Sequence, residues 1–79
     1  MSDNLEKYNT KTPNYYVGKY KGIQAKDVVV DFELTHFKAS AVEYILRSGK
    51  KPGNDEIQDL QKAIHHLTFE IERLTNEQV

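Results

Sequence analysis

The stretch that decides the fold is DEIQDLQKAIHHLTFEIERLTN, residues 55–76. Its large apolar residues recur at alternating spacings of three and four, which is the period of one face of an α-helix. They form an Ile/Leu stripe of Ile57, Leu60, Ile64, Leu67, Ile71 and Leu74. Isoleucine at every first position and leucine at every second is typical of a parallel two-stranded coiled coil. The repeat spans fewer than three heptads. A helix that packs this stripe inside a three-helix fold is therefore the alternative, and both hold if the core forms partly between subunits.

Two more helices are predicted upstream. Thr35 is a good N-cap for a helix over 36–48, and Gly49 is well placed as its C-terminal glycine. One face of that helix would carry Phe37, Ala41, Tyr44, Ile45 and Ser48. The segment 23–34 contains three consecutive valines, which favour a strand, but the spacing of Val28, Val29 and Phe32 fits a helical face better. The predicted fold class is all-α, a small three-helix domain.

Length and composition set the domain organisation. A chain of 79 residues is one domain. Residues 1–12 carry few apolar groups and are expected to form a flexible tail, which leaves 13–79 as a single helical domain. A core of this size is marginal, and the chain has no cysteine for a disulfide. We therefore expect oligomerisation through the C-terminal helix.

Charge and hydropathy exclude several partners. Eleven basic residues against twelve acidic ones lack the strong positive field of a nucleic-acid binder, so no nucleic-acid polymer is expected as a partner. No apolar run approaches the length of a bilayer span, and the first residues resemble no secretory signal. No membrane partner is expected, and a cytoplasmic location follows as the default.

A basic corner follows the second predicted helix. The segment YILRSGKK, residues 44–51, ends in a basic cluster, and a new helix begins a few residues later with free amides that face it. Arg47 can bind a phosphate through two parallel hydrogen bonds, and Lys50 and Lys51 add compact charge. Asp55 and Glu56 at the same helix start would repel an anion unless they turn outward. A solvated, well-capped turn is the alternative.

The segment PNYYVGKYKG, residues 13–22, places tyrosines between glycines and lysines. The glycines predict turns rather than a regular element. The rings could stack on a planar ligand while the lysines meet its phosphates. Alternatively, these amphipathic rings cover the edge of a small core.

Glu56 and Asp59 lie at i and i+3 of one helix, which suits a magnesium ion carried with phosphates. All-helical nucleotide pyrophosphatases pair such a motif with a second acidic motif on an earlier helix, and this chain lacks that second motif. Capping of the helix start is the alternative role for these acids. A Walker loop, a His-Glu-x-x-His zinc motif and a nucleophile with a credible base are also missing from the sequence. The catalytic set is incomplete, no cofactor beyond magnesium is indicated, and binding is favoured over catalysis.

Four motifs together resemble a short phage-encoded domain. They are GKYKGI at 18–23, DVVVDF at 27–32, AVEYILRSGKK at 41–51 and EIQDLQKAIHHL at 56–67, and the resemblance covers about residues 15 to 74. That family is described as a domain of unknown function and as nucleotide-kinase-like, because a similar segment occurs in a phage deoxynucleoside-monophosphate kinase that lacks a Walker loop.

The resemblance implies an all-helical fold, a phage origin and a link to nucleotides. The matching positions are Tyr20, Lys21, Arg47, Lys50, Lys51, Asp59 and Lys62. The chain departs from the family at Lys19, where a histidine is usual, and at Glu43, where a small or amide residue is usual. If the histidine transfers protons in catalytic relatives, its replacement counts against kinase activity here.

Three functional hypotheses result. The first is a phage protein that binds a nucleotide or cyclic-nucleotide-type signalling molecule between subunits of a homo-oligomer, and sequesters it in the host cytoplasm against host defence. Phosphate would be bound by Arg47, Lys50 and Lys51, with Tyr16 or Tyr20 stacked on the base, and Lys21 and Lys62 complete the predicted site. The second is a magnesium-dependent nucleoside-monophosphate kinase that uses Glu56 or Asp59. The third is a coiled-coil adaptor that binds another protein through the Ile/Leu stripe.

Overall fold

The computed structural model describes residues 12–77. A short 3-10 turn, η1 (Asn14–Tyr16), precedes the helices α2 (Ala25–Asp31), α3 (His36–Arg47) and α4 (Glu56–Glu77). The described part contains no strand, only an isolated bridge between Val17 and Gln24. The predicted all-α domain of three helices is thus confirmed. Most of the predicted tail, residues 1–11, lies outside the described part of the chain.

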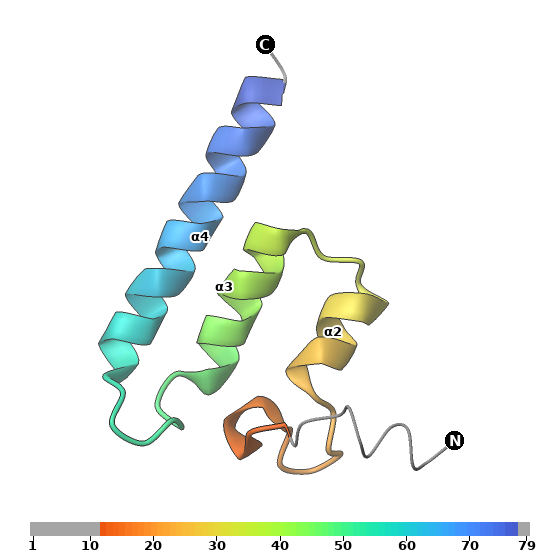
Figure 1. Ribbon diagram of the computed structural model, residues 1–79, viewed down its shortest axis with the longest axis vertical. Coiled ribbons are helices and arrows are strands. Elements are labelled where there is room, and N and C mark those ends of the chain that lie inside the picture. Colours follow the sequence, from red (N-terminus) through yellow and green to blue (C-terminus); the bar gives the residue numbers. More distant parts are fainter. Residues whose placement is uncertain (1–11, 78–79) are drawn as a thin grey trace.

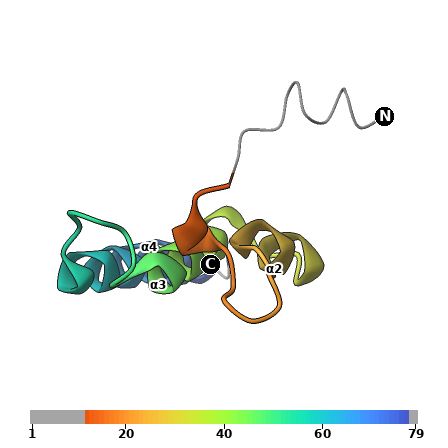
Figure 2. The ribbon, with the colours of Figure 1, turned by 90° about the horizontal axis from the view of Figure 1, so that it is seen from below.

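The three helices lie side by side in one layer instead of surrounding a central core (Figures 1 and 2). α3 is in the middle and packs against α4, α2 and η1. α4 runs antiparallel to α3 and continues well beyond it (Figure 1). With 22 residues against 12, α4 is about 33 Å long and α3 about 18 Å, at 1.5 Å per residue. The last turns of α4 therefore extend past the helix that covers its first turns.

The interior of this layer holds small side chains. In the described residues, the buried hydrophobic residues are Ala25, Ala41 and Ala63. Between α3 and α4, the ring of His66 stacks on Tyr44 with 5.4 Å between centroids, and Phe37 meets Phe69 at 5.4 Å. Alanines allow two helix backbones to approach closely, while the rings fill the space beside them. Helix pairing is thus achieved with little buried aliphatic surface.

The Ile/Leu stripe faces away from α3. Its isoleucines are 60–64% exposed and its leucines 39–43% exposed. The alternative in which this stripe packs inside a three-helix fold is therefore wrong for the single chain. α3 contacts another face of α4, where Asp59, Ala63 and Glu70 are buried.

α2 is shorter than the predicted helix over 23–34. It starts later because the carbonyl of Ile23 accepts the amide of Gly18 at 2.7 Å, so Ile23 belongs to the preceding turn. It ends earlier in a Schellman motif, in which the amides of Glu33 and Leu34 donate to the carbonyls of Val30 and Val29. Glu33 adopts the required positive φ of 52° without being glycine. The sequence thus offered no glycine to mark this helix end, and Phe32, predicted on the buried face, is 71% exposed.

The limits of α3 agree closely with prediction. Thr35 is its N-cap residue, and Gly49 follows its last turn with a φ of 78°. The Thr35 hydroxyl, however, does not cap the helix. It donates instead to the buried carboxylate of Glu70 on α4, which also accepts two hydrogen bonds from Arg73, at 2.7 and 3.2 Å. This contact fastens the start of α3 to the middle of α4.

Glu70 makes this contact sensitive to acid. Hydrogen bonds from Arg73 and Thr35 lower the pKa of Glu70 to about 2, from an ordinary value near 4.5. A carboxylate with a depressed pKa stabilises the fold above its unfolded-state pKa, and that stabilisation is lost as the pH falls through its folded-state pKa. We expect the Glu70 contribution to be complete above pH 4.5 and to disappear between pH 4.5 and 2.

The test is an NMR titration of the Glu70 carboxyl, together with urea unfolding across this pH range. Arg73→Gln should raise the pKa of Glu70 toward 4.5 and flatten the acid-dependent part of the unfolding free energy. Glu72→Gln, at an exposed neighbouring position, is the control and should leave the pKa of Glu70 unchanged. Titration of Glu70 near 4.5 in the unmodified chain would contradict the assignment.

Candidate functional site

An ion pair joins the end of α3 to the first turn of α4. Arg47 donates from Nε and Nη2 to Oδ1 of Asp59, at 3.3 and 3.1 Å. Asn54 Nδ2 donates to the same oxygen at 3.3 Å. The Asp59 side chain is completely inaccessible to solvent and that of Arg47 is 12% exposed. This is a buried, hydrogen-bonded charge pair.

Two tyrosines complete the surroundings of Arg47. Its Cζ atom lies 4.4 Å from the ring centroid of Tyr44, and its Nη1 donates to the hydroxyl of Tyr16 at 3.5 Å. Burial lowers the pKa of Arg47, but the hydrogen bonds and charges of Tyr16 and Asp59 outweigh it, and the net shift is upward. A guanidinium on an aromatic face gains further stabilisation when it is shielded from water. Arg47 thus links η1, α3 and α4.

This arrangement bears on the predicted magnesium pair. Asp59 is directed to Arg47 in the interior, whereas Glu56 is exposed and its carboxylate lies close to the Cα of Gly49. The two carboxylates therefore do not form one open site. The side chain that caps α4 is Asp55, whose Oδ1 accepts the amide of Ile57 at 3.0 Å. Across residues 12–77, no group of three or more His, Asp or Glu side chains is placed to hold a metal ion.

The ion pair is expected to be essential to folding. Asp59→Asn keeps the shape of the side chain but leaves the Arg47 charge buried without a counter-charge. Removal of one partner of a buried pair costs roughly 3–5 kcal/mol, a large share of the total stability of a small domain. Glu56→Gln, which removes an exposed carboxylate one turn earlier, is the matched control and should cost less than about 0.5 kcal/mol. Urea unfolding followed by circular dichroism measures both, and equal stability of the two variants would contradict this role.

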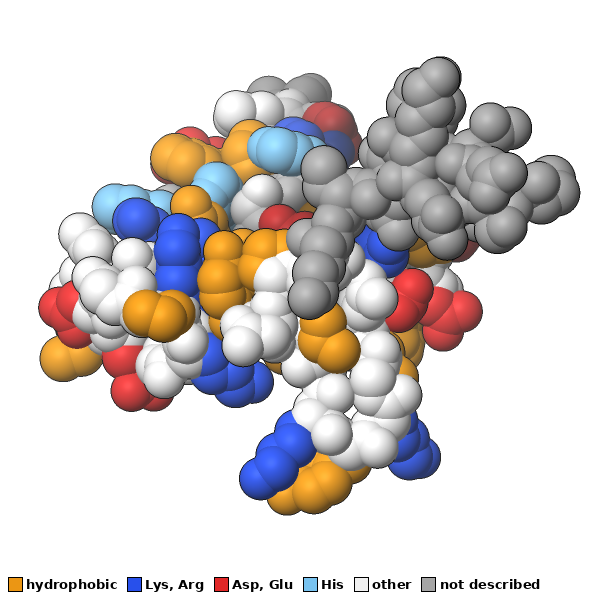
Figure 3. All heavy atoms as spheres, turned by 60° about the horizontal axis from the view of Figure 1, so that its bottom comes forward, with side chains coloured by type: hydrophobic (Ala, Val, Ile, Leu, Met, Phe, Trp, Pro, Cys, Tyr) orange, Lys and Arg blue, Asp and Glu red, His pale blue; other side chains and the backbone are white. Residues whose placement is uncertain are grey.

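A groove beside η1 is lined by Asn14, Tyr15, Val17, Lys19 and Lys50, and we call it the lysine–tyrosine groove. Its volume is about 460 Å³. Its lining carries two lysines and no carboxylate. Lys51 lies at its edge, with Nζ 5.7 Å from the ring centroid of Tyr15. Figure 3, which brings the lower end of Figure 1 forward, shows Lys and Arg side chains beside hydrophobic ones on this face.

A smaller cavity of about 220 Å³ adjoins the groove and shares Tyr15, Val17 and Lys50 with it. It extends between η1, Val28 of α2 and Leu46 of α3. A ligand at the groove would therefore have both a basic, solvent-facing part and an apolar recess within reach. Ligand sites commonly combine an apolar lining with a few polar groups that fix orientation.

The structure places the seven predicted binding residues in three different settings. Lys50 lines the groove and Lys51 lies near its Tyr15 ring without lining it, whereas Tyr16 and Arg47 are engaged with each other in the interior. The remaining three lie elsewhere and do not line the groove: Tyr20, Lys21 and Lys62. Tyr20 is 89% exposed in the turn after Gly18, with Lys19 Nζ 5.4 Å from its ring, and Lys62 Nζ lies 5.5 Å from the ring of Tyr44.

Sequence reasoning missed four groove residues: Asn14, Tyr15, Val17 and Lys19. All four belong to the segment 13–22, which the sequence identified as a tyrosine-lysine element. The choice between adjacent tyrosines was not available from the pattern. In the structure the two rings meet edge to face, 4.7 Å apart at 64°, so that Tyr16 reaches Arg47 while Tyr15 lines the groove.

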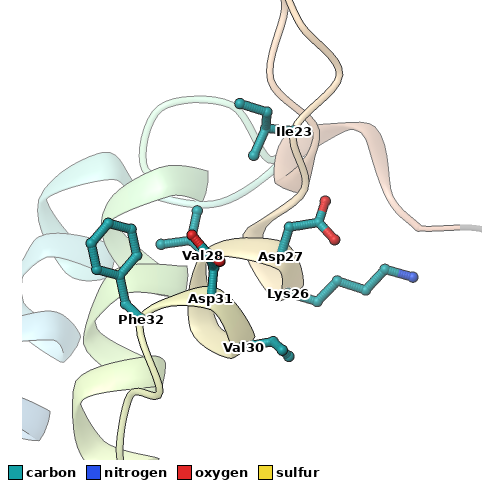
Figure 4. Close-up of a pocket in the computed structure, with 7 residues that line it drawn as sticks. All are labelled: Ile23, Lys26, Asp27, Val28, Val30, Asp31 and Phe32. Atoms are coloured by element: carbon teal, nitrogen blue, oxygen red, sulfur yellow. The ribbon is translucent and has the colours of Figure 1, made fainter.

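Another cavity, of about 570 Å³, lies at α2 and is less suited to a phosphate. It is lined by Ile23, Lys26, Asp27, Val28, Val30, Asp31 and Phe32. Figure 4 shows these side chains spread around the α2 ribbon instead of converging on one point. Two carboxylates against one lysine would repel an anion. This surface is mainly apolar, and the basic groove is the better candidate for a charged ligand.

The comparisons with known proteins find no relative of this chain. A scan against models of protein families finds no match, and neither a search of curated protein sequences nor one of solved structures finds a similar protein. None of the helices in residues 12–77 has both the length and the apolar character needed to cross a bilayer. The functional proposal therefore depends on the groove, together with the resemblance of the motifs.

Proposed function

We propose that this protein binds a nucleotide or a nucleotide-derived signalling molecule in the lysine–tyrosine groove and holds it without converting it. The observation that carries this proposal is a groove with two lysines, a tyrosine and no carboxylate in its lining. Its volume is within the range of about 300–1,000 Å³ that is usual for small-molecule sites. Positive charge beside an aromatic ring matches the two parts of a nucleotide, its phosphates and its base.

Each groove residue has a chemical role in this proposal. Lys19 and Lys50 approach from different segments and meet the phosphate oxygens as compact, fully charged donors. Lys51, at the groove edge, adds a third positive charge. Tyr15 offers its ring to the base, because base–aromatic stacking contributes about 1–3 kcal/mol per base. Asn14 supplies an amide for hydrogen bonds to the sugar or the base.

Binding without turnover is supported by the location of the acidic residues. Asp59 is engaged by Arg47, and neither Glu56 nor any other carboxylate lines the groove. Phosphoryl transfer depends on groups that position the nucleophile and neutralise developing charge, commonly with magnesium held by carboxylates. A protein that only holds its ligand removes it from solution. Together with the phage-like motifs, this favours sequestration of a host signal in the cytoplasm.

Calorimetric titration with nucleoside mono- and diphosphates and with cyclic mono- and dinucleotides tests the proposal. We expect Lys50→Glu to weaken binding roughly ten- to a hundredfold, because a hydrogen bond to a charged group contributes about 1.5–3 kcal/mol. Lys26→Glu makes the same change of charge beside the α2 cavity and should leave the affinity unchanged. Weakening by raised salt should accompany binding.

The outcomes separate binding from catalysis and one site from the other. Nucleotide recovered unchanged after denaturation of the complex supports a binder, whereas conversion in the presence of magnesium would favour a phosphotransferase. Loss of binding in Lys26→Glu but not in Lys50→Glu would show that the ligand binds at the α2 cavity instead of the groove. Absence of heat with every ligand of the panel would overturn the proposal.

A further inference from the structure

We infer that two copies of this chain associate through the Ile/Leu stripe of α4, as a parallel, in-register, two-stranded coiled coil. The inference concerns a face of α4 that plays no part in the groove, and it does not depend on ligand binding. A second copy of the chain is the occupant of this face.

The first observation is the exposure of the stripe. All six of its residues present 39–64% of their surface to solvent, in a continuous row along α4. A contiguous apolar surface of this kind marks an interaction site, unlike single exposed hydrophobic residues. Ile71 and Leu74 lie beyond the contact of Glu70 with Thr35, where α4 has passed the start of α3 (Figure 1). Part of the stripe therefore lies on a helix end that α3 does not cover.

The second observation is the small size of the apolar core within one chain. The buried hydrophobic residues of the described part are three alanines, and no large aliphatic side chain is fully buried. Domains of this size commonly supplement such a core with a disulfide, a metal or oligomerisation. The chain has no cysteine, and residues 12–77 offer no cluster of metal ligands. Association through the exposed stripe supplies the missing apolar burial.

The identity of the stripe residues favours a second copy of the same helix. Isoleucine occupies every a position and leucine every d position, the distribution that selects parallel two-stranded pairing. The stripe carries no charge, and each copy offers the other an identical self-complementary surface about a two-fold axis. Another protein would have to reproduce the same heptad register to bury the row equally well.

Charges beside the stripe favour the parallel orientation. In a parallel pair, the g position of one helix faces an e position of its partner. This brings Glu56 to Gln61 of the other copy. Glu70, also at a g position, is buried and already bonded to Thr35 and Arg73 of its own chain, so that no like charges meet across the pair. An antiparallel pair that aligns the same apolar layers would bring Glu56 of one helix beside Glu77 of the other, at both ends of the interface. Such like-charge contacts are unfavourable.

The oligomeric state tests this inference. Sedimentation equilibrium at micromolar concentration should give twice the chain mass of 9.2 kDa. Ile64→Lys places a charge at the centre of the stripe and should weaken association at least tenfold. His65→Lys introduces the same charge at the next, exposed position outside the stripe and should leave the dimer intact. A monomeric unmodified chain, a trimer or larger assembly, or an unchanged Ile64→Lys dimer would each overturn the inference.

The relative orientation of the two α4 helices can be determined with engineered disulfides, because the chain has no cysteine of its own. In the parallel pair, residue 74 of one helix is beside residue 74 of the other, within the short Cβ distance that a disulfide requires. Leu74→Cys should therefore oxidise to a covalent dimer by itself. In the antiparallel pair, crosslinks would form only when Leu74→Cys is mixed with Ile57→Cys. Crosslinking confined to the mixture would overturn the parallel arrangement.

One measurement uses only the unmodified chain, so it tests the dimer even if the variants fail to fold. If folding and pairing are linked, the midpoint of thermal unfolding rises with protein concentration. A midpoint that stays constant over a hundredfold range of concentration would overturn the inference. This result is independent of nucleotide binding, so failure of the dimer and failure of the groove can be told apart.

Discussion

The ion pair between Arg47 and Asp59 is the interaction on which the rest of the structure depends. It joins the last turn of α3 to the first turn of α4, and through Tyr16 it also holds η1 in place. A buried pair adds little net stability compared with a well-packed apolar contact, because both charges lose their hydration. Its value here is geometric. Three segments meet at one guanidinium, which is carried by α3 and bonded to Asp59 of α4 and Tyr16 of η1.

The flat arrangement of helices follows from what lies between them. Alanines and aromatic rings join α3 to α4, so the pair packs closely without the aliphatic residues of α4. Full burial of an isoleucine or leucine contributes about 1.5–3 kcal/mol, and burial of the exposed half of each stripe residue on the order of 1 kcal/mol. Six such residues per chain are comparable with the 5–15 kcal/mol that stabilises an ordinary domain. If these six residues stay in water, this contribution to the free energy of folding is not gained.

The sequence predicted the helices well and their packing only in part, for a physical reason. α4 carries two rows at the same spacing, the Ile/Leu stripe and a row that includes Asp59, Ala63 and Glu70. Periodicity identifies the apolar row, but the polar row faces α3. Its polar residues bond to Arg47 and Thr35, which are distant in sequence. Local pattern reveals a helix and its approximate limits. It does not reveal which distant partner will satisfy a charge.

Local sequence pattern also could not show which basic residues of the candidate site are buried and which are open to a ligand. Arg47 and Lys50 are close in sequence and both positively charged, yet one is enclosed by Asp59 and Tyr44 while the other lines an open groove. The groove is lined by η1, the residues that follow it and Lys50 of the loop after α3, and Arg47 contacts Tyr16 of η1. Asp59, which anchors those contacts, lies between Ile57 and Leu60 on the first turns of α4. Pairing of the stripe would therefore hold the first turn of α4, and with it Asp59, in place. A chain with so small a core could then still present a defined binding surface.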